Sequence, residues 1–368
     1  MPEHGTFIQI AHGADWGGTE RHLLDLSTNL LQRGYPVKII LSHEGVTAVR
    51  VREQKIPLEI IRRSRIPLDY LFRLRETLRR LPPSLVHVHS GRLPALAARA
   101  AGVSAVVETR HGLGSRRAGA DPPDSREGIR EIVGGSWIDA IITVCRTDRD
   151  YLAAFRGEKA NRVFHIPNGV ARDEFPLKRC LSKPVCSPGN ERAPLCIGYL
   201  GRLSEEKGLL HLLQALSEHS RPFHLEIAGT GPLEKELRAV TQSLDLTSRV
   251  RFIGFLDSIG RYISGWDLVA LPSIWEGLPY AALEALGWGR PLLATRVGGL
   301  PDLIREGEWG WLAAPGDASS LGRALARIPW DRNHLRKMGE KGRQYLSLHF
   351  SLDQMVDRIL DIYKEVMR

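Results

Sequence analysis

The sequence predicts an α/β protein made of two domains, each built on a parallel sheet. A chain of 368 residues is too long for one ordinary core, and its length suits two α/β domains. A hydrophobic content of 43% and a charged content of 25% are those of a soluble globular protein. The clearest β-α-β unit runs from Asp267 to Leu303, where an apolar strand is followed by a helix near Pro279 and by a second strand.

The first half of the chain predicts seven strands, joined by helices and loops. A leucine stripe over Glu20–Arg33 predicts a helix, and Ala95–Ala101 predicts another. Residues 115–124 are rich in glycine and proline, and we expect a mobile loop there. The predicted strands are Phe7–Ala11, Val37–Leu41, Ile56–Ile61, Leu85–His89, Val103–Thr109, Ala140–Val144 and Val163–Pro167.

The second half predicts a further sheet after a linker. Residues 173–194 lack periodicity and are rich in Pro, Ser, Lys and Arg, which is typical of a linker between domains. We therefore expect domains at 1–172 and 195–350. Helices are expected at His211–Leu216, Ala318–Arg327 and Ser351–Met367. The predicted strands are Leu195–Leu200, Leu225–Gly229, Val250–Phe255, Leu268–Leu271, Pro291–Thr295 and Trp309–Ala313.

Two glutamates lie within the β-α-β unit. Glu276 lies in the loop before its helix, and Glu284 lies in the second helical turn. A helix N-terminus suits a phosphate group, and carboxylates on either side of it can accept hydrogen bonds from hydroxyl groups. A phosphate between two hydroxyl-bearing groups describes a sugar nucleotide. The alternative, that both are solvated surface glutamates, stays open.

Fixed cations and a histidine stand at other predicted strand ends. Arg202 and Lys207 flank the turn after the strand Leu195–Leu200, where they could neutralise a diphosphate without a metal ion. His111 follows a strand end, where ligands bind in open α/β sheets. A surface cation pair and a packed histidine are the respective alternatives.

The segment EGLPYAALEALGWGRPLLAT resembles the E-x7-E segment of retaining glycosyltransferases with the GT-B fold, of the glycosyltransferase family 4 type (glycosyl transferases group 1). The pattern GR-x4-KG at 201–208 is a second match to that family. The resemblance implies two Rossmann-like domains that face each other across a cleft. It implies that the first domain binds the acceptor, that the second binds the nucleotide sugar, and that the terminal helix 351–368 crosses back onto the first.

The resemblance also implies roles for single residues. Arg202 and Lys207 would assist the leaving diphosphate, His111 would contact a primary hydroxyl of the donor sugar, and Glu276 and Glu284 would bind a sugar hydroxyl and the ribose. Pro279 stands where other members carry glycine, which puts one backbone contact in doubt because proline has no N–H. The remaining implied donor-binding residues are Gly17, Gly18, Gly229, Phe255, Leu278, Tyr280 and Ala281.

Neither a covalent nucleophile nor a metal site stands out. The likeness therefore implies transfer from the front face with retention, and we expect neither cofactor nor metal. Asp148 and Asp150 form a D-x-D string, but its context favours the start of a helix. The four cysteines lack paired spacing, which fits a reduced cytoplasmic compartment.

A net charge of +9 points to an anionic partner. Residues 62–80 carry seven arginines beside apolar residues, so a basic helix there could lie on an anionic membrane or could be an ordinary domain helix. The first option would place the protein on the inner face of the plasma membrane. We expect a glycan or lipid-linked acceptor, such as a lipopolysaccharide or another envelope glycan. The apolar residues are Leu68, Leu71, Phe72, Leu74 and Leu78.

Two other function classes stay open. A UDP-sugar epimerase of the same fold would need a catalytic acid in place of an acceptor cleft. A nucleic-acid-binding protein would explain the charge of +9, but the sequence lacks interleaved aromatic residues and any reading motif, so we expect no nucleic acid.

Overall fold

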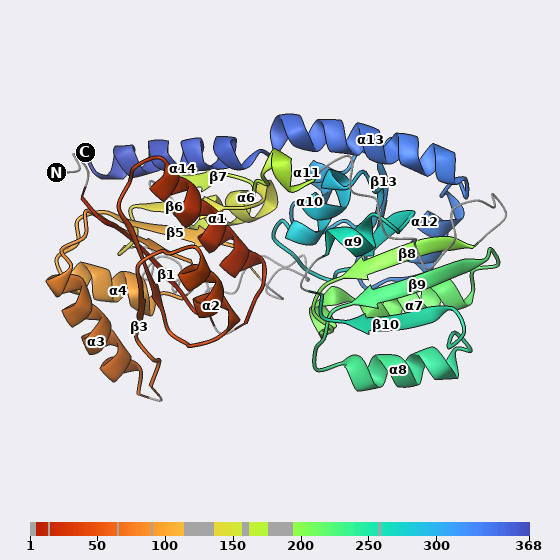
Figure 1. Cartoon of the computed structure of the whole chain (residues 1–368), viewed down its shortest axis with the longest axis horizontal. Helices are drawn as coiled ribbons and strands as arrows, with labels where there is room; N and C mark the ends of the chain where they lie inside the picture. The colour runs from red at the N-terminus through yellow and green to blue at the C-terminus, as the bar shows by residue number, and fades with distance from the viewer. Residues whose placement is uncertain are drawn as a thin grey trace. The chain divides into compact units, whose positions relative to one another are not determined.

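The computed structural model describes residues 5–13, 15–64, 66–89, 91–113, 136–156, 162–175, 194–256 and 259–368. The chain forms two compact units (Figure 1). Among the described residues, the first unit contains those up to Leu113, those between Ser136 and Asn168, and Leu352–Arg368; the second contains those from Gly169 to Ser351. The predicted loop 115–124 and most of the predicted linker lie outside the described residues.

The first unit is a seven-stranded parallel sheet with the strand order β3-β2-β1-β4-β5-β6-β7. Its strands are β1 (Phe7–Ala11), β2 (Val37–Leu41), β3 (Leu58–Ile60), β4 (Leu85–Val88), β5 (Val106–Arg110), β6 (Ala140–Thr143) and β7 (Val163–His165). Its helices are α1 (Gly18–Gln32), α2 (Val46–Glu53), α3 (Pro67–Arg80), α4 (Leu93–Ala100), α6 (Arg146–Arg156) and α14 (Leu352–Val366).

Helices cover both faces of this sheet, as buried parallel strands require. One core is formed between the sheet and α3, α4 and α6. The other contains residues of α1 and α14, which lie beside each other (Figure 1). Tyr363 of α14 is fully buried there and packs edge-on against Phe7 of β1, so residues from widely separated parts of the chain share one core.

The second unit is a six-stranded parallel sheet with the order β10-β9-β8-β11-β12-β13. Its strands are β8 (Leu195–Leu200), β9 (Phe223–Ala228), β10 (Val250–Gly254), β11 (Leu268–Leu271), β12 (Leu292–Thr295) and β13 (Gly310–Ala313). Its helices are η3 (Arg172–Glu174), η4 (Glu205–Lys207), α7 (Leu209–Ser217), α8 (Glu234–Ser243), α9 (Gly260–Ile263), α10 (Tyr280–Gly287), α11 (Leu300–Leu303), α12 (Ala318–Ala326) and α13 (Arg332–His349).

Helix α10 is held in place from two sides. It packs against β11 and β12, and α13 packs against it in turn. A Cβ atom on Gly339 of α13 would come within 1.9 Å of the Gly289 carbonyl oxygen, and one on Gly342 would come within 2.8 Å of Leu286. These contacts leave no room for side chains, so the two glycines allow a close approach between the segments.

The predicted pair of parallel-sheet α/β folds is confirmed. Strands β1, β2, β8 and β11 have the predicted bounds, and the others differ by a few residues at their ends. The sequence analysis missed α2, α8, α9, α11 and α13. Pro279 precedes α10 as its N-cap with extended backbone, rather than lying in the first turn. Asp148 lies in the first turn of α6, as predicted.

Within the described part of the chain, every helix is too short or too polar to cross a membrane.

Candidate functional site

The second sheet has a switch point between β8 and β11. From β8 the chain first adds β9 and β10 on one side, and it then adds β11, β12 and β13 on the other. Loops that leave neighbouring strands at such a point diverge and leave room for a ligand at the carboxyl edge of the sheet. The segments that carry Arg202, Lys207 and Glu276 all leave strands at this edge.

Close backbone contacts hold these loops together. Gly208 has a left-handed φ of 64°, and a Cβ atom there would lie 2.1 Å from the Pro272 carbonyl oxygen. The Ile274 N–H donates to the Glu206 carbonyl at 2.8 Å. The loop after β8 and the loop after β11 therefore form one fixed assembly at the switch point.

The centre of this assembly is an ion pair. Lys207 Nζ lies 2.5 Å from Glu276 Oε1, and both side chains are largely buried, with 22% and 12% of their surfaces exposed. Ser273 Oγ donates to the same carboxylate oxygen at 2.9 Å. A half-buried cation and a carboxylate that pair with each other can each exchange that partner for a ligand group of the corresponding charge.

Arg202 lies on the same loop but is exposed. Its side chain makes no hydrogen bond or ion pair with any other residue that the structure describes. Its carbonyl oxygen accepts a bond of 2.9 Å from the Tyr199 hydroxyl, which fixes the loop. Burial, together with the nearby charges of Glu276 and Glu206, raises the pKa of Tyr199 well above its usual value, so this hydroxyl stays protonated and keeps donating.

The start of α10 faces the same edge. The first N–H groups of a helix, here those of Tyr280 and Ala281, point out of its N-terminal end. Leu278 and Glu284 are buried beside this start, with 4% and 9% exposed. The Thr295 hydroxyl of β12 donates to the Ser273 carbonyl at 2.5 Å, which ties the loop before α10 to the neighbouring strand.

Two further predicted residues lie toward the β10 edge. Gly229 follows β9 with a φ of 137°, and a Cβ atom there would lie 1.9 Å from the Gly201 carbonyl oxygen. Its N–H donates to the Gly254 carbonyl at 2.7 Å. Phe255, the next residue, is 52% exposed, so a large apolar ring is accessible beside this turn.

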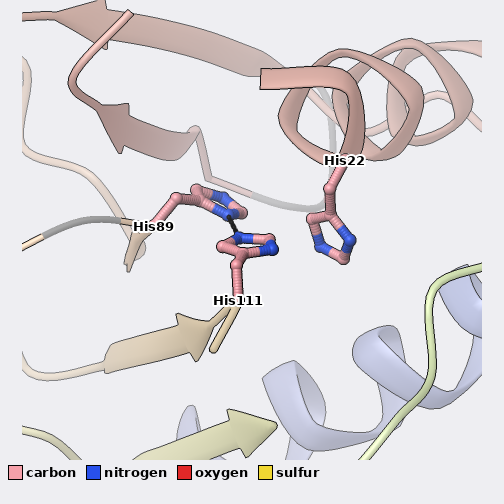
Figure 2. Close-up of side chains that lie close together, drawn as sticks. All are labelled: His22, His89 and His111. Atoms are coloured by element: carbon pink, nitrogen blue, oxygen red, sulfur yellow. Dashed lines mark hydrogen bonds between the residues drawn. The ribbon is translucent and has the colours of Figure 1, made fainter. Parts of the chain in front are cut away.

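The first unit has its own switch point, between β1 and β4, and histidines gather there. His22 lies on α1, His89 follows β4 and His111 follows β5. Figure 2 shows the three rings close together. His111 Nε2 lies 3.4 Å from His89 Nδ1, and His89 Nε2 lies 2.8 Å from the Gln9 side-chain oxygen.

These hydrogen bonds determine which ring nitrogens carry protons. An amide oxygen only accepts, so His89 donates from Nε2 to Gln9, and His22 donates from Nδ1 to the Asn168 oxygen at 3.0 Å. Gln9 then donates to the Tyr363 hydroxyl at 3.0 Å. Burial lowers the pKa of His22 to about 4 and holds the pKa values of His89 and His111 well below their usual range, so the rings are neutral at pH 7.

The predicted residues thus fall into two groups. Lys207, Glu276, Arg202 and the start of α10 share one edge of the second unit, and His111 lies at the switch point of the first. Gly17 and Gly18 are exposed at the start of α1, in the first unit. The sequence analysis missed Ser273, His22 and His89. One signal was present: His87 and His89 alternate in an apolar strand, so both side chains point to one face.

Comparisons with known proteins identify the family. Residues 188–345 match the family Glycosyl transferases group 1, and residues 16–174 match Glycosyltransferase Family 4. The 2-deoxystreptamine glucosyltransferase of Streptomyces kanamyceticus is 30% identical over 78% of this chain and 79% of its own length. An Escherichia coli UDP-Gal:alpha-D-GlcNAc-diphosphoundecaprenol alpha-1,3-galactosyltransferase is 27% identical over 81% and 79%.

Solved structures show the same fold at lower identity. The Anabaena protein HepE, solved in complex with UDP and glucose, superposes with a TM-score of 0.84 at 19% identity, over 98% of this chain and 100% of that one. The sucrose-phosphate synthase from Thermosynechococcus elongatus gives a TM-score of 0.81 at 21% identity, over 98% and 99%. The chain therefore belongs to the glycosyltransferases with the GT-B fold, and its two parallel-sheet units are the two Rossmann-like domains of that fold.

Proposed function

We propose that this glycosyltransferase moves a sugar from a nucleoside-diphosphate sugar to a glycan or lipid-linked acceptor, with retention of anomeric configuration and without a metal ion in the transfer step. The observation that carries the proposal is the Lys207–Glu276 pair at the switch point of the second unit, with the exposed Arg202 on the same loop. Solved GT-B proteins that contain UDP with glucose, or UDP-glucose, support this class of donor.

The ion pair suggests how the donor is received. A diphosphate is a stronger partner for Lys207 than one carboxylate, because it offers more charge and more acceptor oxygens. As Lys207 turns to the diphosphate, Glu276 becomes free to accept a hydroxyl of the transferred sugar. Donor binding thus replaces a pair already present instead of desolvating two separate charges, and Ser273 keeps the carboxylate oriented throughout.

The leaving group is stabilised by fixed positive charge. As the bond from the anomeric carbon to the phosphate oxygen breaks, negative charge grows on the diphosphate. Lys207, Arg202 and the N–H groups at the start of α10 can stabilise it, so no metal is required for this step. The acceptor oxygen attacks the same face of the sugar, and its proton passes to the departing phosphate oxygen. His111, a neutral hydrogen-bonding group, is assigned to the sugar's primary hydroxyl, and Glu284 to the ribose.

The charged surface of the first unit supports an acceptor at a membrane. Helix α3 buries Tyr70, Leu74 and Leu78. Leu68 and Phe72, however, are 63% and 59% exposed, so these two apolar residues are not buried in the domain. Exposed apolar side chains among arginines suit an anionic bilayer, in which the rings and methyl groups enter the lipid and the guanidinium groups meet phosphates. We assign the acceptor to the envelope glycans on this basis.

The proposal is tested by a nuclear magnetic resonance assay of the purified protein with UDP-, GDP- and ADP-sugars, with and without glycan acceptors. We expect release of nucleoside diphosphate that an acceptor accelerates, a product with the anomeric configuration of the donor, and full activity in excess EDTA. Inversion would overturn the stereochemical assignment, and a strict need for Mn²⁺ would overturn metal independence. Interconversion of the free nucleotide sugar would instead identify an epimerase, and inertness toward every donor would remove the catalytic proposal.

A further inference from the structure

We propose that His22, His89 and His111 form a binding site for a divalent transition-metal ion, with Zn²⁺ as the best match. Each ring offers one nitrogen, and the three nitrogens lie within 4.8 Å of one another. The rings come from α1 and from the ends of β4 and β5, so a bound ion would join three elements at the switch point of the first unit (Figure 2). Neutral imidazoles are the nitrogen ligands that zinc takes in proteins.

The distances are close to those of a tetrahedral site. Two nitrogens bound to zinc at about 2.0–2.1 Å lie about 3.3 Å apart at a tetrahedral angle. His89 Nδ1 and His111 Nε2 are already 3.4 Å apart. The third ring therefore needs a displacement of up to about 1.5 Å, within the reach of side-chain rotations, to complete a three-histidine set.

The protonation pattern orients the lone pairs of His22 and His89, and His89 Nδ1 accepts a hydrogen bond from His111 Nε2 until a metal moves that proton to His111 Nδ1. His22 and His89 each give their one proton to an amide oxygen, of Asn168 and Gln9 respectively. The lone pairs of His22 Nε2 and His89 Nδ1 are thereby fixed. Metal-binding histidines nearly always donate their other N–H to such an acceptor, which sets the tautomer and the ring orientation. Asn168 and Gln9 are placed as that outer layer.

One proposed ligand atom stays unsatisfied without a metal ion. His22 Nε2 is buried and makes no hydrogen bond to any residue that the structure describes. Burying a polar atom without a partner costs free energy, and buried polar groups are rarely left unpaired. His22 is fully buried, so its orphaned nitrogen cannot be satisfied at an exposed surface. A metal ion would satisfy it.

The nearby His87 is different and provides a matched control. It is also fully buried, but both its ring nitrogens are used: Nδ1 lies 2.6 Å from the Tyr363 hydroxyl and Nε2 lies 2.8 Å from the Thr109 hydroxyl. Its one lone pair is already used in a hydrogen bond. A substitution at His87 therefore disturbs the same core without removing a ligand.

The experiment measures Zn²⁺ and Co²⁺ binding by calorimetry and visible spectroscopy, on the full chain freed of metal and without any substrate. We expect one equivalent of either ion, a tetrahedral Co²⁺ spectrum, and a melting temperature that rises with Zn²⁺. His22→Leu should abolish stoichiometric binding, and Asn168→Ala should weaken it by about 10- to 100-fold. His87→Gln should bind as the wild type does.

The variants distinguish zinc binding at the three histidines from zinc binding at other residues. If His22→Leu fails to fold, as judged by circular dichroism, His111→Ala replaces it, because His111 is only half-buried. Undiminished binding in a folded ligand variant, or the absence of one bound equivalent in the wild type, would overturn the proposal. So would a site that disappears in Cys180→Ser/Cys186→Ser and survives in the histidine variants. Because no donor or acceptor is present, the result is independent of the proposed transfer reaction.

Discussion

The two units share one architecture but have chemically opposite switch points. In the second unit, a half-buried lysine pairs with a glutamate, and an exposed arginine lies on the same loop. In the first, buried neutral histidines are connected through amides and hydroxyls to Tyr363 on α14. The same sheet edge thus presents formal charge in one unit and uncharged lone pairs in the other.

The difference shows that this edge of a parallel sheet determines where a ligand can bind but not which kind of ligand binds. Diverging loops make room for a ligand in both units, but the side chains on those loops decide what can bind. A charged edge suits a diphosphate, and a neutral imidazole edge suits hydroxyl groups or a soft metal ion. The following changes test how far this contrast holds.

The largest effect should come from removing the charge at the second edge. Lys207→Met should lower turnover by about 100-fold or more, because a preorganised cation beside the leaving group is lost. The measurement is steady-state release of nucleoside diphosphate, with Lys235→Met, an exposed lysine of α8, as the control. Activity in Lys207→Met equal to that of the control would remove Lys207 from the mechanism.

Lowering the pH should destabilise the first unit more than the second. His22 has a pKa of about 4 in the folded state, against an ordinary value of 6.5. Above pH 6.5 the His22 ring is neutral in both the folded and the unfolded protein, and its contribution to stability is fully present. As the pH falls from 6.5 to 4, the ring gains a proton only in the unfolded protein, so the folded state loses stability. Since one pKa unit corresponds to about 1.4 kcal/mol, His22 alone should cost the first unit roughly 3 kcal/mol of stability over this range.

The second unit should respond more weakly between pH 6.5 and 4.5, because among its described histidines burial lowers the pKa of His219 alone. Burial alone would raise the pKa of Glu306, but Arg327 and Arg296 outweigh it and hold that pKa below its ordinary value of 4.5. Its contribution is therefore lost only as the pH falls below 4.5. Hydrogen exchange of the metal-free protein, read unit by unit by mass spectrometry, checks the contrast. His22→Leu should reduce the response of the first unit, while the lowered pKa values of His87, His89 and His111 keep part of it; equal loss in both units would contradict the assignment.

A glycine substitution should loosen the charged edge without removing a charge. Gly208→Ala combines a left-handed φ of 64° with a Cβ position 2.1 Å from the Pro272 carbonyl oxygen, so both strain and displacement are expected. We expect a loss of about 1–3 kcal/mol in unfolding free energy, together with reduced turnover. Gly307→Ala is the control, since it has a φ of 79° but open space around it. Similar losses in the two variants would mean that the contact with Pro272 is unimportant.

The smallest effect concerns the outer surface of the first unit. Phe72→Ser on α3 should weaken sedimentation with anionic vesicles by roughly fivefold, about 1 kcal/mol for a ring that is only partly inserted. Arg62→Gln/Arg63→Gln should weaken it further and reduce its salt dependence. Val49→Ser, an exposed apolar residue of α2, is the control. Binding by the Phe72 and arginine variants equal to that of wild type would leave α3 an ordinary solvated helix.

The fold was largely predictable because its strands are continuous apolar runs. β8 and β11 have the predicted bounds for this reason. Helix α13 was missed because its sequence, RNHLRKMGEKGRQYLSLH, is mostly polar and contains two glycines that would normally weaken a helix. Those glycines serve tertiary packing against Gly289 and Leu286, which no local pattern reveals.

The site was predictable only where its residues follow each other in short motifs. Lys207 and Glu276 stood out because each lies in a recognisable loop, although their direct pairing was not foreseen. His22, His89 and His111 are far apart in the sequence and have no metal-type spacing, and the expectation of no metal rested on carboxylate and cysteine patterns and on the resemblance. Their proximity follows from the sheet order, which places β1, β4 and β5 side by side.

The position of α14 has a consequence for biosynthesis. Tyr363 fills the core of the first unit and donates a hydrogen bond toward His87, yet it follows every residue of the second unit in the chain. A ribosome makes all of the second unit before this helix exists. Domains usually fold in the order of synthesis. Here the unit that starts first should reach its final core last, and a nascent chain that stalls before residue 352 should display an uncovered apolar face to chaperones.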